Sequence, residues 1–453
     1  MLETTGPVGS DESASHRRVL SRVALLGTAT VGIKLVALAK DLLVARQLGA
    51  GDALDAYLVA FVLPSYAAVV LGHTFASAFV PTYIRVWRRD GLPAAQQLAG
   101  GVLAAALAIL APVTLALCIA APLLLPLVGS GFDASKLALT QRLFYPLAGI
   151  VLTSGLSAVI ASILNAHERF VAAAVAPLAI PMATLAVFWW YQSDYGVQAL
   201  AVGTAVGFLG EMLVLVVAAW RSGLLPRPRM PSRSAELSRV GSQYVPVAIG
   251  GVLMSSAMVI DQAMAASLGS GQVSILNYGG KVVAVVLGIV AASLSTVLFP
   301  RFTHLIAAGR MAEFKRTFRG YVLGIVLLSI PGVAVLALFT EPIVRLLFER
   351  GAFTPEVTTA VSRVQWWLLP QVPFYVLNML GARVLSALEG NAAVLRIAAL
   401  NVAVNVVGNL LLMRWFGVEG IAMATSLMYV VATAATLLAI RAKLAVRRPC
   451  GTG

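Results

Sequence analysis

Long apolar runs recur along the whole of this 453-residue sequence, and they constrain its fold more than any other feature. Many exceed about 18 largely apolar residues, the length at which a helix can cross a bilayer. The bilayer core offers the backbone no hydrogen-bond partner, so such runs must be helices, because they are too long for barrel strands. Only 11% of the residues are charged, against about 25% in soluble domains. The sequence therefore predicts an all-α integral membrane protein.

The apolar pattern predicts about twelve transmembrane helices. Several of the runs are longer than a bilayer needs, and we expect these helices to tilt or to kink at a proline. The predicted spans cover residues 23–47, 54–83, 97–127, 140–164, 170–191, 197–220, 242–268, 275–299, 320–340, 358–387, 394–413 and 418–440.

The distribution of lysine and arginine predicts that both termini face the cytoplasm. With the N-terminus inside, 22 of the 33 basic residues fall in cytoplasmic segments, and six fall in outer loops and rims. This is the positive-inside asymmetry of membrane proteins. The same asymmetry accounts for the net charge of +14, so nucleic-acid binding is not expected.

A Pro/Arg/Ser-rich linker divides the predicted helices into two halves of six. The segment DLLVARQLGAG from Asp41 resembles DQAMAASLGSG from Asp261, which indicates a duplication. Halves with an even number of helices share one orientation, so we expect a pseudo-twofold axis along the membrane normal. The predicted parts are an N-terminal tail (1–22), the first half (23–220), the linker (221–241), the second half (242–440) and a C-terminal tail (441–453).

Basic residues inside the predicted spans point to a cationic cavity. Intramembrane charges are costly and usually face a bundle interior or a wet cavity. Lys34, Lys40 and Lys281 come from both halves and suit a phosphate or pyrophosphate group. We add Arg383 to this substrate-binding set. Lys40 also fits a structural pair with Asp41, and Arg383 also fits a place near the inner rim.

Acidic residues in the spans leave two roles open. Asp41, Asp261 and Glu211 either bind a coupling cation, Na+ or H+, or hold helices together. Asparagines recur every fourth residue from Asn401 to Asn409, a pattern more typical of helix packing than of substrate binding. Neither of the two cysteines has metal-ligand spacing, and no nucleotide loop or nucleophile elbow occurs. We expect no metal site, no other cofactor and no enzymatic activity.

Three stretches resemble a known family. AKDLLVARQLGAGDALDAYLVAFVLP (39–64) and FASAFVP (75–81) resemble the first two helices of the MviN/MurJ-type lipid II flippases. These belong to the MOP superfamily with the MATE exporters and the O-antigen and exopolysaccharide flippases. The segment 272–302 resembles the seventh-to-eighth helix region of the same family.

The resemblance implies a flippase of the bacterial inner membrane whose central basic residues engage a lipid-linked pyrophosphate. Lys34, Lys40 and Lys281 stand where the family has arginines, and lysine keeps the charge without the bidentate fork. Asp41, Arg46 and Asp55 match the family pattern directly.

This sequence departs from the family at two points. Ala67 and Ala68 replace an arginine pair that follows the Leu-Pro step at 63–64. Family members typically have fourteen helices, of which the last two form a groove for the polyprenyl tail, and we predict twelve here.

We therefore expect a flippase that translocates an undecaprenyl-pyrophosphate-linked glycan by alternating access. The glycan is a lipid II-like peptidoglycan precursor or an exopolysaccharide or O-antigen repeat unit. The alternative is a MATE-like cation-coupled exporter of small molecules, although cationic substrates favour a carboxylate-rich cavity and the lysines oppose it. The expected partners are the lipid-linked glycan and membrane lipids, and we expect a monomer.

Overall fold

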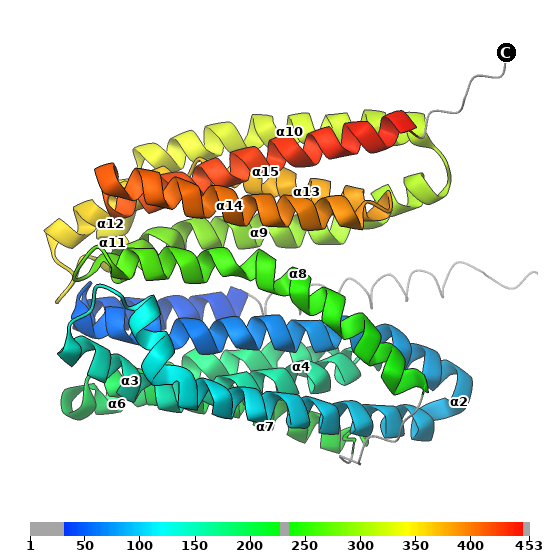
Figure 1. Cartoon of the computed structure of the whole chain (residues 1–453), viewed down its shortest axis with the longest axis horizontal. Helices are drawn as coiled ribbons and strands as arrows, with labels where there is room; N and C mark the ends of the chain where they lie inside the picture. The colour runs from blue at the N-terminus through cyan, green and yellow to red at the C-terminus, as the bar shows by residue number, and fades with distance from the viewer. Residues whose placement is uncertain (1–30, 227–234, 447–453) are drawn as a thin grey trace, which may run out of the picture. The chain divides into compact units, whose positions relative to one another are not determined.

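The computed structural model describes residues 31–226 and 235–446 (Figure 1). Within these ranges every regular element is a helix and no strand occurs. The predicted N-terminal tail, residues 227–234 of the predicted linker and residues 447–453 lie outside the described residues. The prediction of an all-α chain is confirmed.

Helices follow one another with short connections. The first described helix covers residues 31–48. The others are α2 (Asp52–Val128), α3 (Ala134–Ala148), α4 (Ile150–Ala166), α5 (Phe170–Val175), η1 (Ala176–Leu178), α6 (Ala179–Tyr195), α7 (Val197–Arg221), α8 (Ala235–Ala266), α9 (Gln272–Ala307), α10 (Met311–Leu338), α11 (Thr340–Phe348), α12 (Pro355–Leu368), α13 (Gln371–Ala387), α14 (Asn391–Phe416) and α15 (Val418–Val446).

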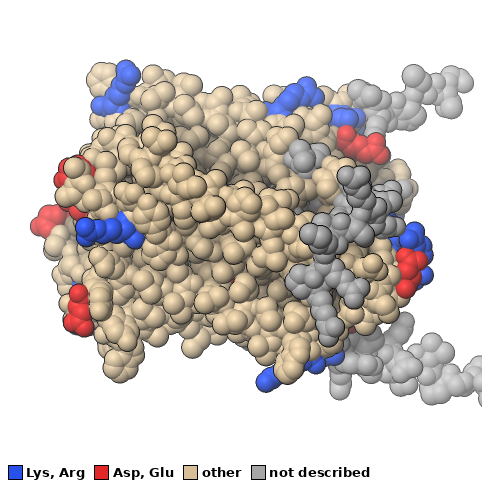
Figure 2. All heavy atoms as spheres, turned by 60° about the horizontal axis from the view of Figure 1, so that its bottom comes forward, with Lys and Arg blue, Asp and Glu red and all other residues tan. Residues whose placement is uncertain are grey.

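Enough of these helices are long and apolar for a multi-pass membrane protein. Among the described residues, ten segments can cross a membrane by length and composition, or eleven when α12 and α13 count as one bent span. The helix over 31–48 corresponds to the first predicted span and carries four charged residues, Lys34, Lys40, Asp41 and Arg46. On the face shown in Figure 2, the charged side chains lie toward the edges of the view, and most of the visible surface between them is uncharged.

Helix α2 contains two predicted spans because it turns back at Gly91. Gly91 has φ 82° and ψ −179°, a backbone conformation that residues with a Cβ rarely adopt. Phe79 and Tyr83 before the break and Leu98 and Val102 after it belong to one buried cluster, so the two arms pack on each other.

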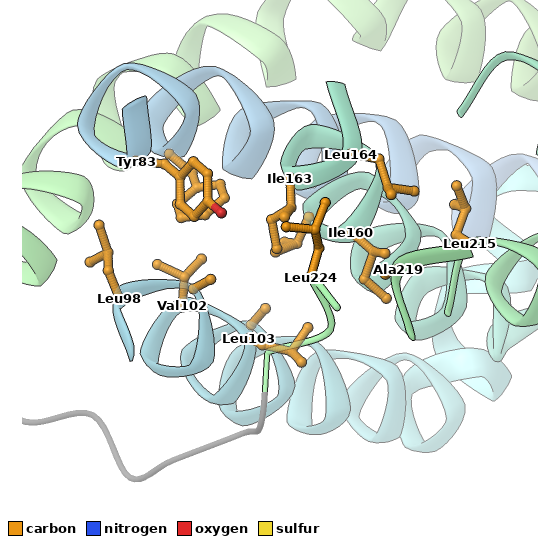
Figure 3. Packing of buried hydrophobic residues seen from close by; sticks show 14 of the residues in the cluster. Tyr83, Leu98, Val102, Leu103, Ile160, Ile163, Leu164, Leu215, Ala219 and Leu224 are labelled. Carbon is orange, nitrogen blue, oxygen red and sulfur yellow. The ribbon is translucent and has the colours of Figure 1, made fainter. Parts of the chain in front are cut away.

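That cluster is the hydrophobic core of one compact unit. The side chains that Figure 3 labels come from α2, α4, α7 and the turn after α7, and they are Tyr83, Leu98, Val102, Leu103, Ile160, Ile163, Leu164, Leu215, Ala219 and Leu224. Beside it, the Tyr83 hydroxyl lies 2.8 Å from His167 Nε2, and partial burial lowers the pKa of the His167 imidazole. The His167 ring also packs on Trp87.

Contacts divide the chain into two compact units. The first comprises the described residues of Met1–Leu43, Ala67–Ile119 and Tyr145–Val247, and the second those of Val44–Tyr66, Ala120–Phe144 and Ala248–Gly453. A second core of Phe302, Phe314, Leu380 and Leu385 lies in the second unit. The units interleave along the sequence, and the division into two duplicated halves stays a prediction.

One helix was not predicted. Residues 341–348, which fall between the predicted spans 320–340 and 358–387, belong to the amphipathic helix α11. Val344 and Phe348 are buried, while Arg345 forms exposed ion pairs with Glu341 and Glu349. Nine residues are too few to show as a span, which is why a search for long apolar runs passes over it.

Candidate functional site: buried charges of the membrane helices

Lys34, Lys40 and Asp41 lie on the helix over residues 31–48. Lys40 Nζ is 2.8 Å from Asp41 Oδ1, with side chains 24% and 16% exposed. Lys40 and Asp41 therefore form the ion pair that the sequence analysis gave as one of two possible roles for Lys40. Lys34 is exposed, one turn and a half earlier on the helix.

Lys281 is half-buried on α9, inside the apolar span Gln272–Ala291. It belongs to the second compact unit, whereas Lys34 and Lys40 belong to the first. A cavity shared by the three lysines stays a prediction.

Arg383 lies on α13 and lines a cavity of about 540 Å³ inside the second unit. Helices α8, α13, α14 and α15 form its walls, and Asn401 on α14 also lines it. The three asparagines of α14 therefore differ in their surroundings: Asn401 lines this cavity, whereas Asn405 and Asn409 do not.

Asp261 on α8 is surrounded by side-chain hydrogen-bond donors. Its carboxylate accepts from Asn405 Nδ2 at 2.9 Å, Asn409 Nδ2 at 2.7 Å and Thr425 Oγ1 at 3.3 Å. These donors come from α14 and α15, so one carboxylate joins three helices. Asn405 and Asn409 are fully buried, and their Oδ1 atoms have no hydrogen-bond partner among the described residues.

Glu211 lies half-buried near the middle of α7. No ion pair to it is found among the described residues. Asp261, one of the three carboxylates predicted to bind an ion or to hold helices, thus accepts hydrogen bonds from side chains of two neighbouring helices.

A further charged cluster, which the sequence analysis did not select, surrounds Asp55 in the first turn of α2. Asp55 is fully buried, at 0% exposure. It accepts hydrogen bonds from Gly271 N at 2.7 Å, Ser274 N at 2.8 Å and Ser274 Oγ at 2.6 Å. Its fourth donor is Lys136 Nζ at 3.0 Å. All of these residues belong to the second compact unit.

The position of Asp55 suits a carboxylate because it lies against the N-terminus of α9. The first backbone N–H groups of a helix have no partner within the helix and carry a partial positive charge. Gly271 precedes α9 in the left-handed region, with φ 77°, which turns its N–H toward Asp55. A Cβ at Gly271 would lie 3.1 Å from the Ala50 carbonyl oxygen, so glycine also permits the close approach of the two turns.

Lys136 supplies the opposite charge from the start of α3. Asp133 caps this helix, since Asp133 Oδ1 accepts from Lys136 N at 2.7 Å. The hydrogen bonds from Lys136 N and Ser135 Oγ lower the pKa of the Asp133 carboxyl. Lys136 Nζ also pairs with Asp52 at 2.6 Å and lies 3.9 Å from the centre of the Phe132 ring. The lysine is 7% exposed, although it lies between the predicted spans 97–127 and 140–164.

The sequence contained a signal for this cluster. Asp52 and Asp55 are three residues apart at the start of an apolar span, so they share one helix face. The rule that buried charges need partners would have selected Asp55. Its partners were not identifiable, because Lys136 and Ser274 are 81 and 219 residues away.

Solved structures share this fold. A lipid II flippase MurJ in an inward closed conformation aligns with a TM-score of 0.79 at 21% identity, covering 92% of this chain and 87% of that chain. A multidrug resistance MATE family transporter in an inward-facing conformation aligns with a TM-score of 0.76 at 15% identity, covering 92% and 96%. The chain therefore has the fold of MOP-superfamily membrane transporters.

Sequence relatives narrow this class to one family. The family described as Lipid II flippase MurJ matches residues 44–450. A probable lipid II flippase MurJ of Rhizobium meliloti (strain 1021) is 29% identical over 415 residues, which are 90% of this chain and 77% of the relative. That of Rhizobium tropici is 26% identical over 416 residues, or 90% and 78%. This chain belongs to the MurJ lipid II flippase family, as its resemblance implied.

Proposed function

We propose that this protein flips lipid II, an undecaprenyl-pyrophosphate-linked peptidoglycan precursor, across the bacterial inner membrane. The observation that carries the proposal is the family match across residues 44–450. The cationic residues Lys34, Lys40 and Lys281, which lie on helices of the predicted spans, agree with it, because cations attract a pyrophosphate. Both termini are expected in the cytoplasm, from the distribution of basic residues.

Transport by purified protein tests the proposal. The protein is reconstituted in vesicles that carry fluorescent lipid II, and an impermeant quencher measures the fraction that changes leaflet. We expect transfer of lipid II above protein-free vesicles. Transfer of an exopolysaccharide repeat unit in its place would assign the chain to that glycan class. Efflux of a cationic dye without lipid transfer would favour the exporter alternative.

We further propose that the Asp261 cluster binds the coupling cation. One carboxylate compensates a single charge, so Na+ or H+ fits better than a divalent ion. The amides of Asn405 and Asn409 donate to Asp261, and their buried oxygens have no hydrogen-bond partner within the described part of the chain. A half-turn of each amide would present these oxygens, together with the carboxylate, to a bound cation.

Replacing Asp261 by asparagine is expected to remove the dependence of transport on the cation, because the variant keeps the shape of the side chain and loses its charge. Initial rates are measured in vesicles with imposed Na+ and pH gradients. Asp41→Asn and Glu211→Gln serve as matched controls that keep the dependence. The assignment would be contradicted if the transport rate of the wild type depended on neither gradient, or if the rate of Asp261→Asn still depended on one of them.

A further inference from the structure

The cavity of about 540 Å³ in the second compact unit combines polar and apolar walls. Its size lies within the range of about 300–1,000 Å³ that suits small organic ligands. Val394, Ile397 and Met428 line one part of it. Tyr375 and Tyr429 line another part, with ring centres 5.2 Å apart in an edge-to-face arrangement. Such walls fit the apolar faces of a sugar or of an amino-acid side chain.

Arg383 gives the cavity its charge. Among the described residues that line the cavity, it is the only one with a full charge. A guanidinium presents a planar fork that matches a carboxylate through two parallel hydrogen bonds. A pyrophosphate carries more negative charge than one guanidinium compensates, and Lys34, Lys40 and Lys281 are proposed for that group.

Amide and hydroxyl groups around Arg383 supply further hydrogen bonds. Asn401 Oδ1 is buried without a hydrogen-bond partner among the described residues. Such an atom costs free energy unless a ligand or water donates to it. Asn378 Oδ1 accepts from Thr436 Oγ1 at 2.8 Å, which leaves the Asn378 amide nitrogen as a donor. Ser386 adds a hydroxyl. The cavity therefore offers both donors and acceptors to a ligand.

We propose that this cavity binds the non-phosphate part of the translocated headgroup, a sugar or peptide segment that carries a carboxylate. Arg383 holds the carboxylate, Asn401 and Asn378 bind hydroxyl or amide groups, and the apolar wall packs against the rest. This inference rests on the proposed function and assigns a second part of the substrate to a place other than the lysines.

Binding of two separate substrate fragments tests the proposal. The first probe is the disaccharide pentapeptide of lipid II without pyrophosphate or lipid, and the second is undecaprenyl pyrophosphate. Calorimetric titrations use the full chain in nanodiscs. Arg383→Gln is expected to weaken the affinity for the first probe at least about tenfold, because one charge-assisted hydrogen-bond pair is lost. The affinity for the second probe is expected to stay within about twofold of the wild-type value. Asn401→Leu is expected to weaken the first probe as well.

Two variants control for folding and for nonspecific charge. Arg396→Gln removes an exposed arginine of α14 that does not line the cavity, and it is expected to bind both probes as the wild type does. Arg383→Lys keeps the charge without the fork, and intermediate binding is expected. The proposal is overturned if the wild type does not bind the first probe, if Arg383→Gln binds it normally, or if Arg383→Gln loses the second probe instead.

Transport separates this inference from the proposed function. If the wild type transfers lipid II and Arg383→Gln binds the first probe as the wild type does, the cavity assignment is rejected and the flippase proposal stands. Arg383-dependent binding without lipid II transfer supports the cavity and rejects the flippase proposal.

Discussion

Replacing Asp55 by alanine is expected to destabilise the protein by about 3–5 kcal/mol, the cost of leaving one partner of a buried ion pair uncompensated, and to abolish transport. The change leaves Gly271 N and Ser274 N at the start of α9 without their acceptor. It also leaves Lys136, which is 7% exposed, with Asp52 alone. Thermal unfolding of the purified protein and vesicle transport measure the two effects.

Asp52→Asn is the matched control for Asp55→Ala. The Asp52 side chain is 60% exposed, and exposed pairs contribute about 0–1 kcal/mol. A double-mutant cycle with Lys136→Met should show coupling between Asp55 and Lys136, because replacing both partners removes the unpaired charge. An Asp55→Ala variant that unfolds and transports like the wild type would refute the structural role of this cluster.

Removing the charge of Lys34 or Lys281 is expected to reduce lipid II transport about 100-fold. We expect the bound pyrophosphate to desolvate these lysines, and loss of one partner of a desolvated charge pair costs roughly 2–5 kcal/mol, where about 1.4 kcal/mol corresponds to a factor of ten. Lys34→Ala and Lys281→Ala are compared at equal membrane expression, in vesicles and in a flippase-deficient strain. The binding of undecaprenyl pyrophosphate should fall in parallel with transport.

Arginine at the same positions should retain transport, since a guanidinium keeps the charge and adds a bidentate donor. Lys315→Ala, at an exposed site near the start of α10, controls for the loss of a lysine elsewhere. Full transport by both alanine variants would exclude the lysines from pyrophosphate binding.

Most of the helices could be predicted from the sequence because span length is a local property. Bilayer thickness fixes how many apolar residues a span needs, and the predicted span 197–220 differs from α7 by one residue at its end. The turn of α2 at Gly91 falls between the predicted spans 54–83 and 97–127. Helix α11 was not predicted, because it is short and its apolar side is buried by packing.

The two aspartates that align in the predicted repeat show why the site was harder to predict. Asp41 pairs with its own neighbour, Lys40. Asp261 has no such neighbour in sequence and binds asparagines 144 and 148 residues away. Equivalent positions in a duplicated pattern therefore have different chemistry, which depends on which helices pack beside them.

The sequence by itself determined that this chain is a multi-pass helical membrane protein of the MurJ family, because hydropathy and the motifs of residues 39–64 depend only on residues adjacent in the chain. It also placed the costly charges in helices. Only the tertiary structure decided the partners of those charges. Lys136 meets Asp55, and Asn405 meets Asp261, because distant helices pack together. A buried charge is stabilised by whatever donors surround it, and that surrounding forms only when the chain is folded.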